Sequence, residues 1–156
     1  MEIEKQINIE RAYRTDALSS FFCGVREIDL LIHKKENGLK TFIEQNSCEF
    51  YIVSIEQAII ALFIISRRTI SIENQEEDSI ELDFLAVRKE YRNKNIGTIV
   101  IKQIEIQAKQ NGYNFLTVGA FKNKKYNASG FYEKNGFIIN GKQEENAIPM
   151  LKILTD

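Results

Sequence analysis

The chain has 156 residues, about the size of one domain and long enough to bury a hydrophobic core. Its 21 lysines and arginines almost balance 22 aspartates and glutamates, and the net charge of −1 excludes a surface that is basic throughout, so a polyanion site must be a local patch. Cys23, Cys48 and His33 lack metal-type spacing, which predicts no metal site, and only two cysteines in a chain of this size predict reduced thiols. The charged N-terminus and the absence of an 18-residue apolar run predict a cytoplasmic protein with no membrane segment.

The first half of the chain is predicted to contain one edge strand, a split helix and three further strands. The edge strand is expected at 7–13, the split helix at 26–45, and the three further strands at 50–55, 58–66 and 79–87. An acidic loop is expected at 73–78, before the last of these strands. The break in the helix is expected at Glu-Asn-Gly, 36–38. Glu56-Gln57 separates two β-rich segments, which predicts a hairpin although the turn lacks Asn-Gly.

The second half is predicted to contain two helices and three strands. They are expected from Gly97 to 110 (helix), at 115–121 (strand), 127–134 (helix), 137–140 and 147–154 (strands). Asn-Gly pairs at 111–112 and 135–136 are expected to end the helices. One proline and no linker predict a single domain. The element order predicts an α/β (α+β) fold with a mixed, largely antiparallel sheet of about seven strands and helices on both faces.

The segment LDFLAVRKEYRNKNIG, Leu82–Gly97, combines a strand end with a basic loop. An apolar run stops at Val87, and four cations follow within seven residues: Arg88, Lys89, Arg92 and Lys94. A loop between a strand and a helix exposes the first N–H groups of the helix, where phosphate is the usual ligand. The cations could serve that site or simply form a solvated basic loop. The two known phosphate-loop motifs, GxxxxGK[ST] and GxGxxG, are both absent.

Two motifs resemble those of the GNAT superfamily of N-acetyltransferases. The first is the acetyl-coenzyme A motif, a strand-ending Val followed by Arg or Gln, two residues, Gly, one residue and Gly or Ala. Here it is Val87 with the cofactor loop, as we call residues 92–98. The second is GFYEKNGF, 130–137, an aromatic-Tyr pair before a short helix and Gly-Phe. Together the motifs imply a GNAT domain over 1–156.

The resemblance implies acetyl-CoA as co-substrate, with no metal. The pantetheine arm would bind the backbone like an added strand, and the pyrophosphate would bind the cofactor loop; the implied residues are Leu85, Ala86, Val87, Arg92, Asn93, Lys94, Asn95, Ile96, Gly97 and Thr98. Asn95 replaces the first Gly of the motif, which often has positive φ, a conformation that Asn tolerates. Lys125 replaces an Asn that helps hold the cofactor in many relatives.

Acyl transfer to an amine requires a base, an oxyanion donor and an acid for the leaving thiolate. The resemblance implies Glu81 as the base, directly or through water. Glu81 could equally be a solvated residue at a strand entrance, and Asp83 on the same face is the reserve candidate. Tyr132 matches the general acid of the family, although an aromatic on a short helix can also be core packing. The Val87 N–H is the implied oxyanion donor.

The segment 18–36, which contains FFCG and Ile-Asp, resembles a GNAT subgroup that includes bacterial toxins acetylating aminoacylated tRNA. In that subgroup a ribbon-helix-helix antitoxin is the usual partner. Phe84 replaces a common cation, and the slightly acidic net charge is unsuited to gripping tRNA. We therefore expect a small-molecule or peptide amine acceptor, with aminoacyl-tRNA as the alternative and a non-catalytic acetyl-CoA-binding module as a third hypothesis.

Two features leave further alternatives. The run FKNKKYN, 121–127, mixes lysines with aromatics, as single-stranded RNA binders do, but also suits a solvated loop. A homodimer is compatible with the sequence.

Overall fold

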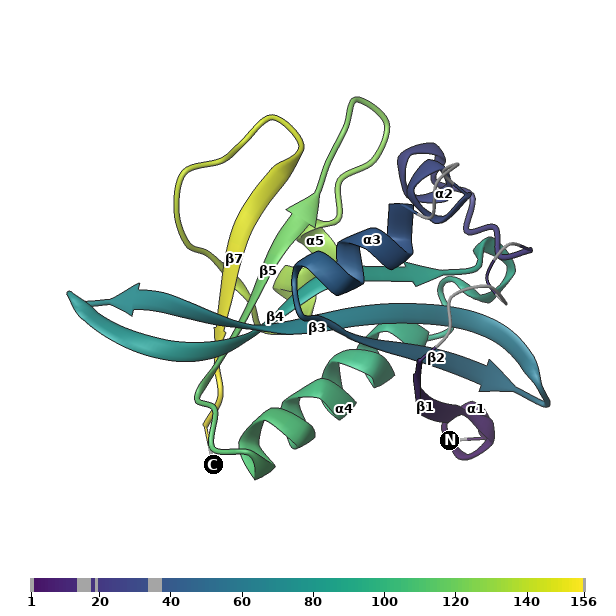
Figure 1. The fold of residues 1–156 in the computed structure, drawn as a ribbon, viewed down its shortest axis with the longest axis horizontal. Coiled ribbons are helices and arrows are strands. Elements are labelled where there is room, and N and C mark those ends of the chain that lie inside the picture. Colours follow the sequence, from purple (N-terminus) through teal and green to yellow (C-terminus); the bar gives the residue numbers. More distant parts are fainter. Residues whose placement is uncertain (1, 14–17, 19, 34–37, 156) are drawn as a thin grey trace. The chain divides into compact units, whose positions relative to one another are not determined.

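The computed structural model describes residues 2–13, 18, 20–33 and 38–155 (Figure 1). Their elements are α1 (Glu2–Gln6), β1 (Asn8–Ala12), α2 (Arg26–His33), α3 (Gly38–Gln45), β2 (Glu49–Ile55), β3 (Ala58–Ile72), β4 (Gln75–Val87), the 3₁₀ helix η2 (Lys89–Tyr91), α4 (Ile96–Gln110), β5 (Phe115–Phe121), α5 (Ser129–Lys134), β6 (Ile138–Ile139) and β7 (Ala147–Ile153). The predicted order is confirmed, with α1 as an additional element. Two residues of the predicted helix break, 36–37, lie outside the described residues.

The seven strands form one mixed sheet in the order β1-β2-β3-β4-β5-β7-β6. β4 pairs with β5 in parallel, whereas β1–β2, β2–β3, β5–β7 and β6–β7 are antiparallel pairs. This confirms the predicted mixed, largely antiparallel sheet. β1 is an edge strand, as its alternating sequence predicted.

The prediction of an acidic loop at 73–78 is wrong. β3 extends to Ile72 and β4 begins at Gln75, so only Glu73 and Asn74 lie between the two strands, with φ of 50° and 66°. Positive φ at both central residues is typical of a two-residue hairpin turn. The strand residues nearest this turn are largely exposed, so they carry charges that resemble a loop in the sequence. Glu56 and Gln57 form a similar positive-φ turn, which confirms the β2–β3 hairpin.

The chain divides into two compact units, which we call unit 1 (1–66 and 84–99) and unit 2 (67–83 and 100–156). In unit 1, the middle of β3 is buried on both faces, since Ile60 to Ile64 are all 0% exposed. This double burial explains why AIIALFII is continuously apolar instead of alternating. The predicted single domain stays a prediction.

In unit 2, the buried apolar side chains lie mainly on one face of α4 and on β5 and β7. Gly112 has φ 84° and ends α4 as predicted, and the Tyr113 N–H donates to the Ala108 carbonyl at 2.9 Å. α5 begins two residues later than the extent predicted for 127–134, because the Asn127 side chain accepts the Ser129 N–H at 2.9 Å in a turn. In the described part of the chain, no helix is long and apolar enough to span a membrane.

Candidate active-site residues

The cofactor loop leads into the N-terminus of α4. The first intrahelical bond that it closes runs from the Ile99 N–H to the Asn95 carbonyl at 3.0 Å, so the N–H groups of Ile96, Gly97 and Thr98 precede the hydrogen-bonded ladder. The first turn of α4 contains no acidic residue. The backbone here can therefore receive an anion, with the positive end of a 15-residue helix behind it.

The conformation predicted for Asn95 is confirmed. Its φ is 63°, the left-handed region that the glycine of the motif often adopts. Asn93 has φ 60°, a second left-handed residue that the motif comparison did not predict. Asn93, Lys94 and Asn95 are all exposed, whereas Ile96 is buried and fixes the start of the helix to the core.

The cations of the loop divide into two groups. The Arg92 Nε–H donates to the Val87 carbonyl at 3.1 Å, and its guanidinium also donates to the Cys23 carbonyl. The Arg88 Nε–H donates to the Ile59 carbonyl at 2.7 Å. Both arginine side chains thus donate hydrogen bonds to backbone carbonyls of unit 1 and are not simply solvated. Lys94, in contrast, is exposed, with its ammonium 5.4 Å from the centre of the Tyr91 ring.

Leu85, Ala86 and Val87 form the end of β4 in unit 1. Ala86 is buried, and Leu85 and Val87 are half-buried. The next N–H, of Arg88, donates to the Ile60 carbonyl at 2.8 Å, so the attachment to β3 continues past the strand end. The structure thus brings the predicted pantetheine residues and the cofactor loop together through the Arg92–Val87 hydrogen bond.

In unit 2, Glu81 lies in a cluster with Asp83 and Arg68, and no sequence pattern indicated the part played by Arg68. The Arg68 Nε–H donates to Glu81 Oε2 at 2.8 Å, and its Nη2 to Asp83 Oδ1 at 3.2 Å. The side chains of Glu81 and Asp83 are 29% and 4% exposed. Burial raises the pKa of Glu81, the hydrogen bond from Arg68 lowers it, and the charge of Asp83 raises it further, with a raised pKa as the net result.

Tyr132 lies on α5 in unit 2 and is 6% exposed. Its ring makes edge-on contacts with Phe131 and Phe137, with centroids 5.0 and 5.5 Å away. Burial raises the pKa of the phenol, so it stays protonated at neutral pH. Tyr132 therefore packs in the aromatic core and also keeps a proton that it could donate.

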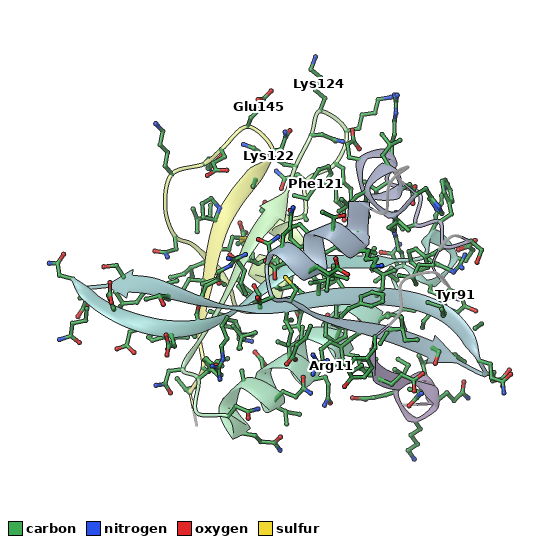
Figure 2. All side chains as sticks on the ribbon, in the orientation of Figure 1. Arg11, Tyr91, Phe121, Lys122, Lys124 and Glu145 are labelled. Atoms are coloured by element: carbon green, nitrogen blue, oxygen red, sulfur yellow. The ribbon has the colours of Figure 1, made fainter. Side chains whose placement is uncertain are left out.

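The loop at 121–127 is a structured turn at one end of unit 2. The Asn123 side chain accepts hydrogen bonds from the N–H groups of Lys125 and Tyr126 at 2.9 and 2.7 Å, and the backbones of Lys122 and Asn127 pair in an isolated antiparallel β-bridge. Figure 2 shows Lys124 at the tip of this loop, pointing away from the strand. Lys125, which replaces the cofactor-binding Asn of many relatives, is exposed here.

Two residues that the sequence singled out have structural contacts in unit 1. The His33 Nε2 contacts the Phe21 carbonyl. The Cys23 thiol is completely buried, and this burial raises its pKa to about 11, which makes it a poor nucleophile at neutral pH. The described residues contain no group of three His, Cys, Asp or Glu side chains placed to hold a metal ion.

Comparison with known proteins places this arrangement among acetyltransferases. A model of the acetyltransferase (GNAT) family matches residues 13–137. A Tyr-to-Phe mutant of the toxin AtaT, bound to the C-terminus of the antitoxin AtaR and acetyl-CoA, is similar with a TM-score of 0.70, 20% identity and coverage of 96% of this chain and 94% of that chain. A search of curated proteins found no match.

Two further solved structures show the same likeness. The KacTA–DNA complex has a TM-score of 0.69 and 20% identity, with 92% of each chain covered. AtaT complexed with acetyl-methionyl-tRNAfMet has a TM-score of 0.67 and 19% identity, with 92% of this chain and 93% of that chain covered. At these identities the likeness establishes a common fold.

Proposed function

The chain belongs to the acetyltransferase (GNAT) family, and on that premise we propose that it transfers the acetyl group of acetyl-CoA to a primary amine by direct attack in a ternary complex. The observation that carries the proposal is the start of α4. Three N–H groups ahead of the helical ladder and positive φ at Asn93 and Asn95 are features that an anion-binding backbone requires, and they lie within the acetyl-CoA motif.

We assign acetyl-CoA binding to residues of unit 1. Its pyrophosphate would accept hydrogen bonds from the N–H groups of Ile96, Gly97 and Thr98, and Lys94 is exposed and can approach phosphate. The pantetheine amides would bind the backbone of Leu85 to Val87. The Arg92 side chain is already engaged with two carbonyls, so we assign its backbone and not its guanidinium to the cofactor.

In the proposed reaction, the amine nitrogen attacks the thioester carbonyl carbon and loses a proton to a base, directly or through water. An alkyl amine with a pKa of about 10.4 is almost entirely protonated at neutral pH, so a base accelerates the step. We assign Glu81 to this role, since its raised pKa brings a carboxylate closer to the range useful to a general base. Asp83, nearly buried and held by Arg68, remains the reserve candidate.

The tetrahedral intermediate would be stabilised by the Val87 N–H and would collapse with cleavage of the C–S bond. The departing thiolate then takes the phenolic proton of Tyr132. Burial keeps the phenol protonated at neutral pH, so its proton is present when the thiolate leaves. The same residue packs against Phe131 and Phe137, so packing and catalysis are compatible here.

A second candidate acceptor is the amino group of aminoacyl-tRNA, which would make the protein a toxin with an antitoxin partner. Its support is the likeness to AtaT over nearly the whole chain and the exposed lysines of the loop at 121–127. The net charge of −1 favours a smaller amine, since phosphate contacts supply much of the affinity for nucleic acid. We therefore keep a small-molecule or peptide amine as the first candidate.

Release of CoA from labelled acetyl-CoA in the presence of polyamines, amino acids, aminoglycosides, peptides and aminoacylated tRNA tests the proposal. We expect transfer to one class of primary amine, with transfer strongly reduced by Tyr132→Phe and unchanged by Tyr13→Phe, which alters an exposed tyrosine outside the proposed site. Transfer to aminoacyl-tRNA alone, with growth arrest on expression that Tyr132→Phe relieves, would select the second candidate. No transfer to any acceptor and no stabilisation by acetyl-CoA would contradict both.

A further inference from the structure

The Cys23–Gly24 turn, which precedes α2, is held by side-chain hydrogen bonds. The N–H groups of Cys23 and Gly24 donate to the two carboxylate oxygens of Asp29 at 2.7 and 3.1 Å. Asp29 is only 7% exposed, and Gly24 has φ 83°, a conformation that glycine adopts without strain. The carboxylate therefore fixes the amide side of this turn with two charge-assisted hydrogen bonds.

The carbonyl side of the same turn is held by the cofactor loop. The Cys23 carbonyl accepts a hydrogen bond from the Arg92 guanidinium. The backbone of Cys23 thus lies between an anion at its N–H and a cation at its carbonyl. Nearby, the Arg88 guanidinium lies 4.8 Å from the centre of the Phe21 ring, a second contact between this segment and the strand end.

Arg92 reaches in the other direction to the end of β4. Its Nε–H donates to the Val87 carbonyl at 3.1 Å while its other nitrogen holds Cys23. A planar guanidinium with several fixed donors can join two carbonyls in this way, whereas the single ammonium of lysine lacks that geometry. Arg92 is therefore a bridge between the Cys23–Gly24 turn and the residues proposed to bind acetyl-CoA.

We propose that Arg92 is a positioning residue that couples the Cys23–Gly24 turn to the cofactor loop, so that binding of acetyl-CoA orders the turn. This inference rests on the proposed binding of acetyl-CoA by that loop. Coupling between two sites is reciprocal: if acetyl-CoA stabilises the turn, an intact turn strengthens acetyl-CoA binding by the same factor. A substitution at Asp29, on the far side of the turn from Arg92, should then weaken cofactor affinity.

The buried Cys23 thiol provides the measurement. It is 0% exposed, so iodoacetamide reaches it only when the turn opens, and Cys48 in the same molecule is an internal reference. In the wild-type protein, acetyl-CoA at 100 times its Kd should slow alkylation of Cys23 by up to about 100-fold where opening requires cofactor release. Mass spectrometry of the full chain resolves the two cysteines.

Two variants of the cofactor loop distinguish the hydrogen bonds of Arg92 from the general effect of removing a positive charge. In the Arg92→Gln variant without cofactor, iodoacetamide should alkylate Cys23 faster than in the wild type. Acetyl-CoA should no longer protect Cys23 in this variant. Lys94→Gln removes the same charge from an exposed side chain of the same loop, and its Cys23 rate without cofactor should equal the wild-type rate. Arg92→Lys, a milder change in case the Gln variant fails to fold, should give an intermediate rate.

Asp29→Asn supplies the reciprocal test, since it keeps the side-chain shape and loses the charge. It should weaken acetyl-CoA binding by about fivefold or more, measured by calorimetry. Equal Cys23 rates in the folded Arg92 variants and Lys94→Gln, or unchanged affinity in Asp29→Asn, would overturn the coupling. Absence of any acetyl-CoA binding to the wild type would instead overturn the proposed function, and the cofactor-free rates would still test the bridge.

Discussion

The Nε–H of Arg68 donates to Oε2 of Glu81 at 2.8 Å. This contact opposes the two influences that raise the pKa of Glu81, its burial and the neighbouring charge of Asp83. An arginine beside a general base is a compromise, because it keeps the carboxylate ionised and also occupies one of its oxygens. A neighbour on β3 therefore limits how far the pKa of the proposed base is raised.

Arg68→Gln should move the acid limb of the kcat/KM profile to higher pH by about one pH unit, since loss of the cation raises the pKa of Glu81 further and a base acts only when deprotonated. Arg67→Gln is the matched control, because the Arg67 guanidinium lies 5.6 Å from the centre of the Tyr113 ring and does not affect the pKa of Glu81. Arg68→Lys keeps the charge and should retain most of the wild-type profile. Identical profiles for Arg68→Gln and Arg67→Gln would remove Glu81 from the role of base.

Asn95→Gly should leave folding and acetyl-CoA affinity intact or improve them, because glycine adopts the observed φ of 63° without strain. Asn95→Val should destabilise the protein by about 1–2 kcal/mol, since a β-branched residue is strained there. Thermal unfolding of the two variants measures the difference. A Gly variant that loses acetyl-CoA binding would show that the Asn side chain itself contacts the cofactor.

Gly97→Val should abolish acetyl-CoA binding while the protein still folds. The branched side chain would stand beside the N–H groups of the first turn of α4, where phosphate oxygens must approach the backbone. Valine is also a somewhat better helix former than glycine, so α4 should survive. Circular dichroism checks the fold and calorimetry the binding, with Gly97→Ala expected to fall between. Wild-type affinity in the Val variant would place the pyrophosphate elsewhere.

The elements that local patterns control could be predicted from the sequence. β5 coincides with the predicted 115–121, since a buried strand is a continuous apolar run, and Gly112 and Gly136 end their helices at the predicted Asn-Gly pairs with positive φ. The charged end of the β3–β4 hairpin was missed because exposed strand and loop have similar compositions. Arg68 follows the predicted end of its strand, so no pattern indicated its alignment with Glu81.

The hydrogen bonds made by Arg92 could not be predicted from the sequence either. The acetyl-CoA motif locates this residue, and a basic side chain there suggests phosphate. Its hydrogen bond to the Cys23 carbonyl joins residues 69 positions apart in sequence and depends on how the turn before α2 packs on the loop. The motif therefore predicted the backbone conformation at Asn95 but not the direction of the neighbouring arginine.

Tyr132→Phe should lower the single-turnover rate of acetyl transfer by about 10²- to 10⁴-fold, the usual contribution of a general acid, with little change in acetyl-CoA affinity. The change removes one oxygen and keeps the ring, so the contacts with Phe131 and Phe137 should persist. The lost proton is needed only as the tetrahedral intermediate collapses, so the effect belongs to the transition state and not to binding. Because CoA release could limit kcat, rapid-quench measurement of one turnover is the proper test. A Phe variant with the wild-type single-turnover rate would mean that the thiolate leaves unaided or takes its proton from water, and Tyr132 would then be a packing residue alone.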